Sequence, residues 1–291
     1  MDRLDSNRLF YDGYFSNRLA AGTKKRRLKR NSVLPPDVQM LSSHRASGGF
    51  GRSLGRHRFH LSIAKSKEVF HMKTMRSYIN QYVELSVSGR KDCVRGLLID
   101  IGSDIMVLHD GERFLYLPLL HLQQMSLSVK QEAGVEFSGI SWEPSQDLSY
   151  RKVLMNAKGM FTELYITGNQ SIHGYVTSIM NDFFVFQSPV FHSVLIAMRH
   201  LKYLIPYSPN ATPYAMNPTS FPVSTPTMAL ARTIDQQLKK LEGEFVVLNL
   251  GENPGKIGLL KTADTPIIEV ITSGGASMFM HIDHVKTVHR P

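Results

Sequence analysis

From about residue 72 onward, the chain alternates short apolar runs with turn residues. Runs of about four to eight residues rich in Val, Ile, Leu, Phe and Tyr are typical of β-strands. In the first stretch these runs predict strands at 82–88, 93–101, 105–109, 113–117 and 121–127. Apolar residues at helical spacing predict short helices at 73–79, 148–157 and 232–241, the second behind Asp147 as a candidate cap. The pattern predicts a mainly β chain in which a short helix precedes each group of strands.

The same arrangement occurs three times, with the same landmark residues in each copy. Each copy has a glycine in the second predicted strand, an aspartate before the third and a histidine at the fifth: Gly96, Asp104 and His121; Gly174, Asp182 and His200; Gly258, Asp264 and His284. The glycine-to-histidine spacings are 25, 26 and 26 residues. Self-similarity at a fixed period is the signature of a tandem repeat.

These recurring residues are interpreted as structural positions. Glycine weakens a flat strand, so its recurrence indicates a sharp bend of the kind that a small closed barrel needs. The aspartates are expected to hydrogen-bond turn backbone, and the histidines to cap the turn before the fifth strand. A ligand or proton-transfer role for the histidines is the alternative. Asp110-Gly111 predicts a two-residue hairpin turn between the third and fourth strands of the first copy.

The repeat divides the chain into predicted segments. The division is a basic, disordered segment 1–71, barrels at 72–128, 147–206 and 230–291, and a Pro/Ser/Thr-rich linker 207–229, with a polar spacer between the first two barrels. The first segment lacks apolar periodicity, so it would bury too little surface to offset the entropy lost on ordering. A start-site artefact, with Met72 or Met75 as the true first residue, is a further interpretation of that segment.

The net charge of +10 is confined to the N-terminal quarter. Residues 1–71 contain 15 Lys and Arg against 5 Asp and Glu, and the remainder contains 19 of each. Clustered cations bind phosphates, so one basic run is a candidate nucleic-acid contact: Lys24, Lys25, Arg26, Arg27, Lys29 and Arg30. A solvated, flexible tail is the competing interpretation. Nucleic-acid binding is therefore expected only through the tail.

Candidate chemistry elsewhere is sparse. The single cysteine, Cys93, excludes an intramolecular disulfide; we expect it in the core, with a cross-linking thiol between subunits as the alternative. His281 and His284 lack a third nearby ligand for zinc. The sequence predicts no catalytic residue, no cofactor and no metal site. No apolar run approaches the roughly 18 residues of a spanning helix, so no membrane span is expected.

Two runs in the first copy resemble a known family. Residues 96–108 (GLLIDIGSDIMVL) resemble the first Sm motif, and residues 114–122 (FLYLPLLHL) resemble the second. The pattern Gly-x-Leu-x-Asp-x-Gly-x-Asp with Pro-Leu-Leu-His is similar to an Sm-like domain of Bacillus-type endospore formers. Copies ending in 200–204 (HLKYL) and 284–288 (HVKTV) resemble spore coat protein B and its relatives.

The resemblance covers about residues 72–291. It implies three tandem Sm-like barrels, each with an N-terminal helix, and a non-enzymatic structural or assembly protein. It also implies a location in the spore coat after synthesis in the mother-cell cytoplasm, with other spore coat proteins as partners. Because small barrels leave edge strands available, we hypothesise a homo-oligomer, in which a dimer would bring together six barrels.

RNA-binding Sm proteins carry an Asn in the first motif and Arg-Gly in the second, and this chain carries neither at those places. Only Arg199-His200 is similar to the Lys-His pair of the bacterial Hfq protein. RNA binding by the barrels is therefore not expected. The alternative function, from a different class, is a cytoplasmic RNA- or DNA-binding regulator that uses the basic tail.

Overall fold

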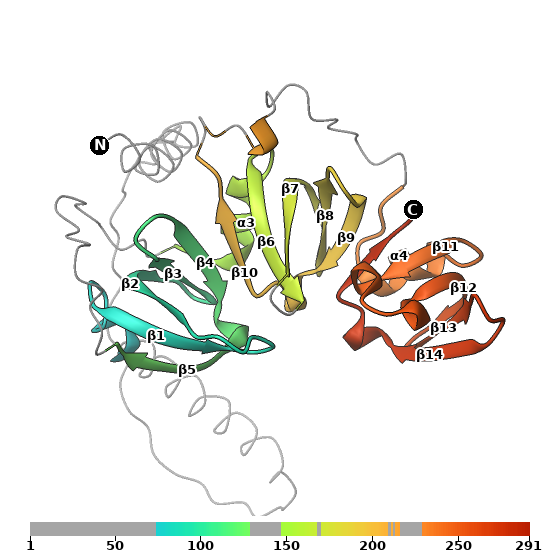
Figure 1. Cartoon of the computed structure of the whole chain (residues 1–291), viewed down its shortest axis with the longest axis horizontal. Helices are drawn as coiled ribbons and strands as arrows, with labels where there is room; N and C mark the ends of the chain where they lie inside the picture. The colour runs from blue at the N-terminus through green and yellow to red at the C-terminus, as the bar shows by residue number, and fades with distance from the viewer. Residues whose placement is uncertain (1–73, 129–146, 168–169, 209–210, 212, 216–228) are drawn as a thin grey trace, which may run out of the picture.

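A computed structural model describes residues 74–128, 147–167, 170–208, 211, 213–215 and 229–291 (Figure 1). The predicted basic segment, with its run from Lys24 to Arg30, lies outside the described residues, as do the spacer 129–146 and most of the linker. We call the described residues 74–128 the first unit, 147–208 the second unit and 229–291 the third unit.

Each unit contributes five strands. The first unit contains β1 (Tyr82–Val87), β2 (Val94–Ile101), β3 (Ile105–His109), β4 (Phe114–Pro118) and β5 (Leu122–Leu127). The second contains α3 (Tyr150–Ala157), β6 (Phe161–Thr167), β7 (Gln170–Ile179), β8 (Phe183–Ser188), β9 (His192–Ala197) and β10 (Tyr203–Pro206). The third contains α4 (Ile234–Lys240), β11 (Phe245–Leu248), β12 (Ile257–Asp264), β13 (Ile267–Thr272), β14 (Ser277–His281) and β15 (Thr287–His289).

A 3-10 turn ends at the recurring histidine of every unit: η1 (Leu119–His121), η2 (Met198–His200) and η7 (Ile282–His284). The described residues also contain the 3-10 turns η3 (Pro213–Ala215), η5 (Asn249–Gly251) and η6 (Pro254–Lys256). Of the helix predicted at 73–79, residues 74–76 are helical and the following residues form turns.

The described strands form one sheet of fifteen strands, in the order β14-β13-β12-β11-β15-β9-β8-β7-β6-β10-β4-β3-β2-β1-β5. The prediction of a mainly β fold is therefore confirmed. The sheet is not a closed barrel, so three separate closed barrels are not what the structure shows. The physical reason is that the fifth strand of a unit does not return to its own fourth strand. Instead, β10 pairs with β4, and β15 pairs with β9.

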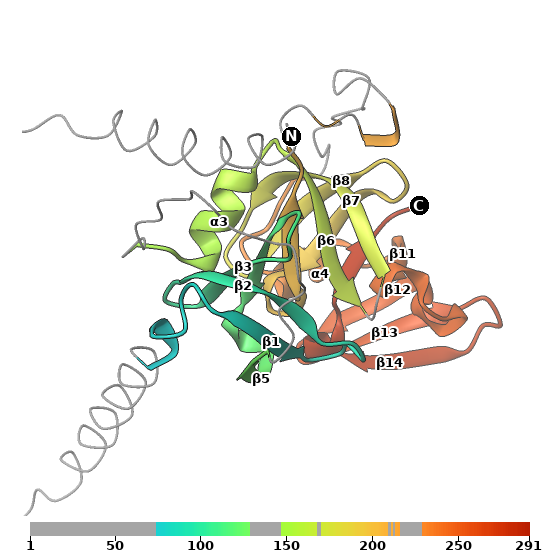
Figure 2. The same ribbon diagram turned by 60° about the vertical axis from the view of Figure 1, so that its left-hand side comes forward.

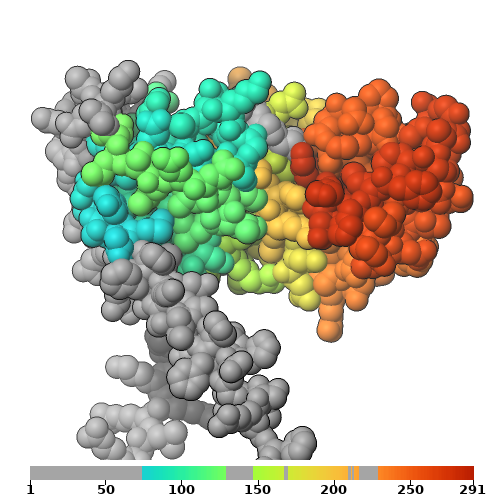
Figure 3. All heavy atoms as spheres, turned by 90° about the horizontal axis from the view of Figure 1, so that it is seen from below, coloured from blue at the N-terminus to red at the C-terminus, as the bar shows by residue number. Residues whose placement is uncertain are grey.

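The three units lie side by side in an arc, with β5 at one end and β14 at the other (Figure 1). Figure 2 shows α3 of the second unit beside β2 and β3 of the first. Seen from below, the units form a continuous body in chain order (Figure 3). The arrangement leaves one strand at each end of the sheet with a single described neighbour.

The hydrophobic cores are shared between neighbouring units. One cluster combines Val107 and Tyr116 of the first unit with Leu154 and Leu204 of the second. Another combines Phe183 and other residues of the second unit with α4 and the strands of the third. Burial of apolar surface stabilises a fold by about 25 cal/mol per Å². Much of that stabilisation is therefore gained only when the units are joined.

Two local features differ from the sequence predictions. Ser149 caps α3 by accepting a hydrogen bond from the Lys152 amide at 3.4 Å, whereas Asp147 forms an ion pair with the Lys152 side chain. The loop between β3 and β4 spans residues 110–113, and of Asp110 and Gly111 only the glycine has a positive φ. Asp110 accepts hydrogen bonds from two amides of that loop, so a longer turn replaces the predicted two-residue one.

The recurring glycines mark a close approach between the second and third strands of each unit. A Cβ at Gly96, Gly174 or Gly258 would lie 2.6, 2.0 or 2.0 Å from a carbonyl oxygen of the facing strand. A few residues further on, each second strand has a register shift: Leu98/Asp100, Val176/Ser178 and Leu260/Thr262. A bulge of this kind bends a strand, which fits the predicted bend.

This close approach gives a stability prediction. The Gly258→Ala substitution should lower the free energy of unfolding by about 1–3 kcal/mol, because the new methyl group would displace the Ile271 carbonyl. Gly274→Ala is the matched control, since its Cβ would meet nothing within 4 Å. Urea unfolding of the two variants measures the difference; equal stabilities would contradict the steric explanation.

Candidate functional site

The two junctions between units have the same register. At the first junction Leu204 of β10 lies opposite Tyr116 of β4, and at the second Val288 of β15 lies opposite Leu195 of β9. In both junctions, the residue four positions after the recurring histidine of one unit faces a residue of the preceding unit. That second residue lies five positions before the recurring histidine of the preceding unit. The sheet therefore continues from one unit to the next through the same strand pairing at both junctions.

Apolar side chains cross each junction from the preceding unit. Ile105, Val107 and Tyr116 of the first unit belong to the core of the second. The equivalent residues of the second unit, Phe183, Val185 and Leu195, belong to the core of the third. All six are at most 2% exposed. The third and fourth strands of a unit thus complete the core of the unit that follows.

The recurring aspartates cap the helix of the following unit. The Tyr150 amide at the start of α3 donates to Asp104 Oδ1 at 2.7 Å, and the Ile234 amide at the start of α4 donates to Asp182 Oδ1 at 2.9 Å. A carboxylate there satisfies a free helical N–H and complements the helix dipole. Asp264 of the last unit instead pairs with Lys239 at 2.7 Å, and its side chain is 76% exposed. Sequence reasoning predicted a turn role and missed this cap.

The first two recurring histidines, His121 and His200, contact the following unit. The ring of His200 donates from Nε2 to the Asp283 carbonyl at 2.8 Å. His121 Nδ1 lies 3.0 Å from Ser88 Oγ and 3.1 Å from Lys202 Nζ of the second unit. Because an ammonium group only donates, His121 Nδ1 acts as the acceptor. The predicted backbone contact thus exists for His200, but it reaches a neighbouring unit.

Burial and nearby positive charge lower the pKa values of the histidines at both junctions. Burial, reinforced by the charge of Lys202, lowers the pKa of His121 to about 4, although the Arg199 backbone opposes the shift. Burial also lowers the pKa of His200, and the nearby cations Arg199, Lys202 and Lys286 act in the same direction. The pKa of Lys202 is lowered by its own burial and by Lys286. Both histidines are therefore held in their neutral forms.

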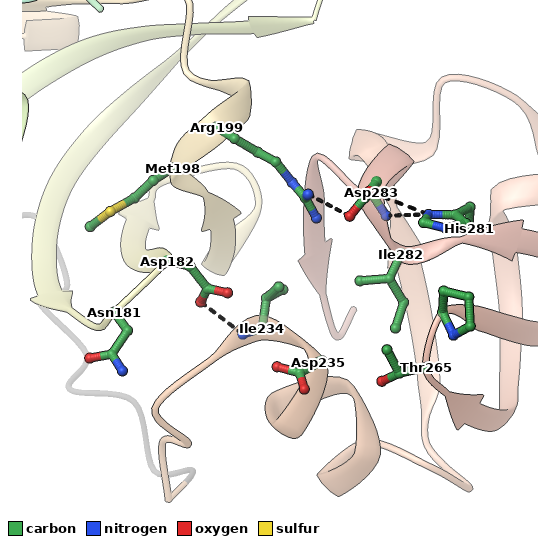
Figure 4. A pocket seen from close by; sticks show the side chains of 11 residues that line it. Asn181, Asp182, Met198, Arg199, Ile234, Asp235, Thr265, His281, Ile282 and Asp283 are labelled. Atoms are coloured by element: carbon green, nitrogen blue, oxygen red, sulfur yellow. Dashed lines mark hydrogen bonds and ion pairs between the residues drawn. The ribbon is translucent and has the colours of Figure 1, made fainter. Parts of the chain in front are cut away.

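A pocket of about 410 Å³ lies at the second junction (Figure 4). Its walls come from both units, with Asp182, Met198 and Arg199 on one side and Ile234 and Asp283 on the other. Two of the charged groups that line it take part in contacts between the units: Arg199 forms an ion pair with Asp283, and Asp182 caps α4. The pocket is thus part of the junction.

Within the described residues, no group of three or more His, Cys, Asp and Glu side chains is placed to hold a metal ion. No helix in the described part of the chain is long and apolar enough to cross a membrane. Cys93, predicted to lie in the core, is exposed, because β2 begins one residue later at Val94. Asp104, His121, Asp182 and His200 lie at the junctions, whereas Asp264 and His284 of the third unit do not, and the recurring glycines lie within the units.

The repeated junctions define a class of protein: a tandem-repeat β protein whose units share one continuous sheet. Residues 233–288, from the start of α4 into β15, match the family described as the YwrJ third domain. The chain is also similar to the uncharacterized protein YwrJ of Bacillus subtilis (strain 168), with 42% identity over 226 residues. That match covers 76% of this chain and 100% of the relative. The chain belongs to the YwrJ family.

The inter-unit cap can be tested at the second junction. Asp182→Ala should lower the free energy of unfolding by about 0.5–2 kcal/mol, because the first amide of α4 loses its acceptor. Asp182→Asn should retain most of the stability, since asparagine caps helices comparably. Urea unfolding compares the two variants; an equal loss for both would show that the cap is not what Asp182 provides.

The buried histidines predict a loss of stability in mild acid. An unfolded histidine has a pKa of about 6.5, so a folded pKa of about 4 makes the stabilisation complete above pH 6.5 and progressively smaller below it. Urea unfolding at pH 7.5 and pH 5.0 should show this loss while carboxylates stay mostly ionised. His121→Gln, which has no titrating ring, should lose less between the two pH values than the wild-type chain. An identical loss would contradict the assignment to His121.

Proposed function

We propose that this chain is a non-enzymatic structural or assembly protein that acts through multivalent protein–protein contacts. The observation that carries the proposal is the pair of strands at the ends of the sheet. β5 and β14 each have one partner among the described strands, so each presents an unpaired backbone edge. Open edges pair readily with further strands. A protein that already joins its units edge to edge is suited to joining other chains in the same way.

The exposed apolar residues near these edges support an interaction role. Phe279 of β14 is 66% exposed, and Leu127 of β5 is 51% exposed. Neither strand carries a Lys, Arg, Asp or Glu, the charges with which proteins commonly protect an edge. Two such edges on one chain make the contacts multivalent, and linked sites gain affinity through effective concentration.

We further propose that each unit is an Sm-like module and that the protein works in the endospore coat. The module proposal is supported by the short helix before five strands, the glycine in the second strand and the aspartate before the third. The coat proposal is supported by the resemblance of 200–204 and 284–288 to spore coat protein B. The relative from Bacillus subtilis is compatible with this proposal, although its name states no function.

Fractionation of spores tests the proposed location. An endospore-forming bacterium that carries this chain is sporulated, and coat extract and vegetative cytosol are compared by peptide mass spectrometry. We expect peptides of the three units in the coat extract, because an edge-assembled protein should stay in the insoluble layers. Confinement to the cytosol of growing cells would contradict the coat role.

A binding assay distinguishes the nucleic-acid alternative. The full chain is titrated onto single-stranded RNA and duplex DNA at two salt concentrations, beside a variant in which Lys24, Lys25, Arg26, Arg27, Lys29 and Arg30 are replaced by Gln. An assembly protein should show no appreciable binding. Tight binding that falls steeply with salt and disappears in the variant would favour the regulator.

A further inference from the structure

We propose that the partner of these open edges is a second copy of this chain: β14 of each copy pairs with β5 of the other, closing a two-fold ring of six units. The inference rests on the proposed assembly function and names the partner of its edges. It follows from comparing the two ends of the sheet with the two junctions inside it.

The β14 end has two of the three apolar residues of a junction, the third position being Thr265 where the other units have Ile105 and Phe183, but no described unit receives them. Val107 and Tyr116 of the first unit are 0% and 1% exposed, and Val185 and Leu195 of the second are 0% and 2% exposed. The equivalent residues of the third unit are Ile267 and Phe279, which are 41% and 66% exposed. Two of the three positions that insert into a following core thus remain apolar where no described unit follows.

The β5 end shows the complementary deficit. In β10 and β15, which pair across junctions, every residue is buried. In β5 no residue is buried, although it occupies the equivalent place in the first unit. Met125 is partly exposed, whereas its equivalents Leu204 and Val288 are 0% exposed. β5 therefore keeps the central apolar residue of a junction strand, Met125, without a described preceding unit that would cover it.

The recurring histidines show the same gradient along the chain. His121 is buried beneath the second unit, His200 is partly buried by the third, and His284 is exposed. The Arg199 backbone affects the pKa of His121, and His200 donates a hydrogen bond to the Asp283 carbonyl. Each of these backbone groups belongs to the residue directly before the recurring histidine of the following unit. In the ring, the equivalent group for His284 is the backbone of Leu120 in the second copy.

The shared register fixes how the two edges meet. Both internal junctions pair the residue four positions after the recurring histidine of one unit with the residue five positions before the recurring histidine of the preceding unit. Applied between copies, this rule places Met125 of one copy opposite Phe279 of the other. The second junction also pairs Thr287 with Ile196, which places Gln124 opposite Met280.

The arc of the chain favours closure over an open fibre. Head-to-tail contacts form a ring when the rotation closes and a filament when it does not. In Figure 1, β5 and β14 lie at opposite ends of the arc and on its same, lower side, so a second arc can meet both ends at once. Closure also removes both unpaired edges, which a filament never does.

Disulfide cross-linking of the full chain tests the register. In a Cys93→Ser background, Met125→Cys and Phe279→Cys are combined, because directly opposite residues lie within the roughly 7 Å between Cα atoms that a disulfide allows. Met125→Cys with Ser277→Cys is the matched control, displaced by two residues along β14. We expect a covalent dimer from the first pair on oxidation, and at least fivefold less from the second.

Each other result overturns the proposal. A covalent ladder of larger species would show edge pairing without ring closure, and an internal disulfide in a monomer would show a chain closed on itself. Equal cross-linking by both pairs would contradict the register. No cross-linking, with a native mass of one 32.9 kDa chain at tens of micromolar, would exclude the second copy as partner.

A second pair of variants tests the apolar contact. Phe279→Lys places on the edge the residue that most often protects an open strand, and it lies opposite Glu269 of its own unit, so the fold is preserved. We expect native mass spectrometry to show a monomer for this variant and a dimer of twice 32.9 kDa for the wild type. Met155→Lys, on the exposed face of α3 in the middle unit, should remain a dimer. A dimeric Phe279→Lys variant with native circular dichroism would contradict the proposal.

The two proposals can fail separately. A dimer that is absent from the spore coat would contradict the proposed location and leave the ring intact. A monomer that is abundant in the coat extract would contradict the ring and leave the structural role, with another coat protein as the partner of the edges.

Discussion

The pairing of a fifth strand with the fourth strand of the preceding unit is the interaction on which the rest of this structure depends. Because β10 and β15 each pair with the first strand of their own unit and also with the fourth strand of the preceding unit, the described strands form one sheet instead of separate barrels. The same pairing brings the third and fourth strands of one unit against the core of the next. It also carries Asp104 and Asp182 to the starts of α3 and α4.

A unit in this arrangement is incomplete by itself, and this explains why equivalent residues have different environments. Tyr116 and Leu195 are buried because the following unit packs against them. Phe279 is exposed because its strand, β14, lies at the end of the described sheet. A charged side chain at such an exposed position would have little effect on the stability of the fold. Its aromatic residue and the uncharged β14 are therefore best explained by an interaction, which connects the packing of the sheet to an assembly role.

The strands and the repeat could be predicted from the sequence because they depend on local alternation and on spacing within one copy. The roles of the recurring residues could not, because they depend on contacts between copies. Asp104 lies before a strand in a way typical of a turn former, yet its partner is the Tyr150 amide, 46 residues later. A useful signal was present: each of the first two aspartates is followed by another helix-containing copy, and Asp264 is not.

The exposure of Cys93 and the longer loop at Asp110 were missed for a different reason. A strand boundary displaced by one residue decides whether Cys93 lies in β2 or before it, and hydrophobic pattern alone does not fix a boundary that closely. The Asp110 side chain accepts hydrogen bonds from two loop amides and so stabilises a four-residue loop. The Asp-Gly pair in the sequence predicts a two-residue turn instead.

Amide hydrogen exchange of the full wild-type chain, followed by mass spectrometry across a dilution series, tests the central claim most directly. It compares the internal junction strands β10 and β15 with the end strands β5 and β14 in one experiment. The account predicts that all four are protected at tens of micromolar and that only the peptides of β5 and β14 lose protection on dilution. Rapid exchange in β5 and β14 at every concentration would contradict ring closure, and rapid exchange in β10 and β15 would contradict the shared sheet itself.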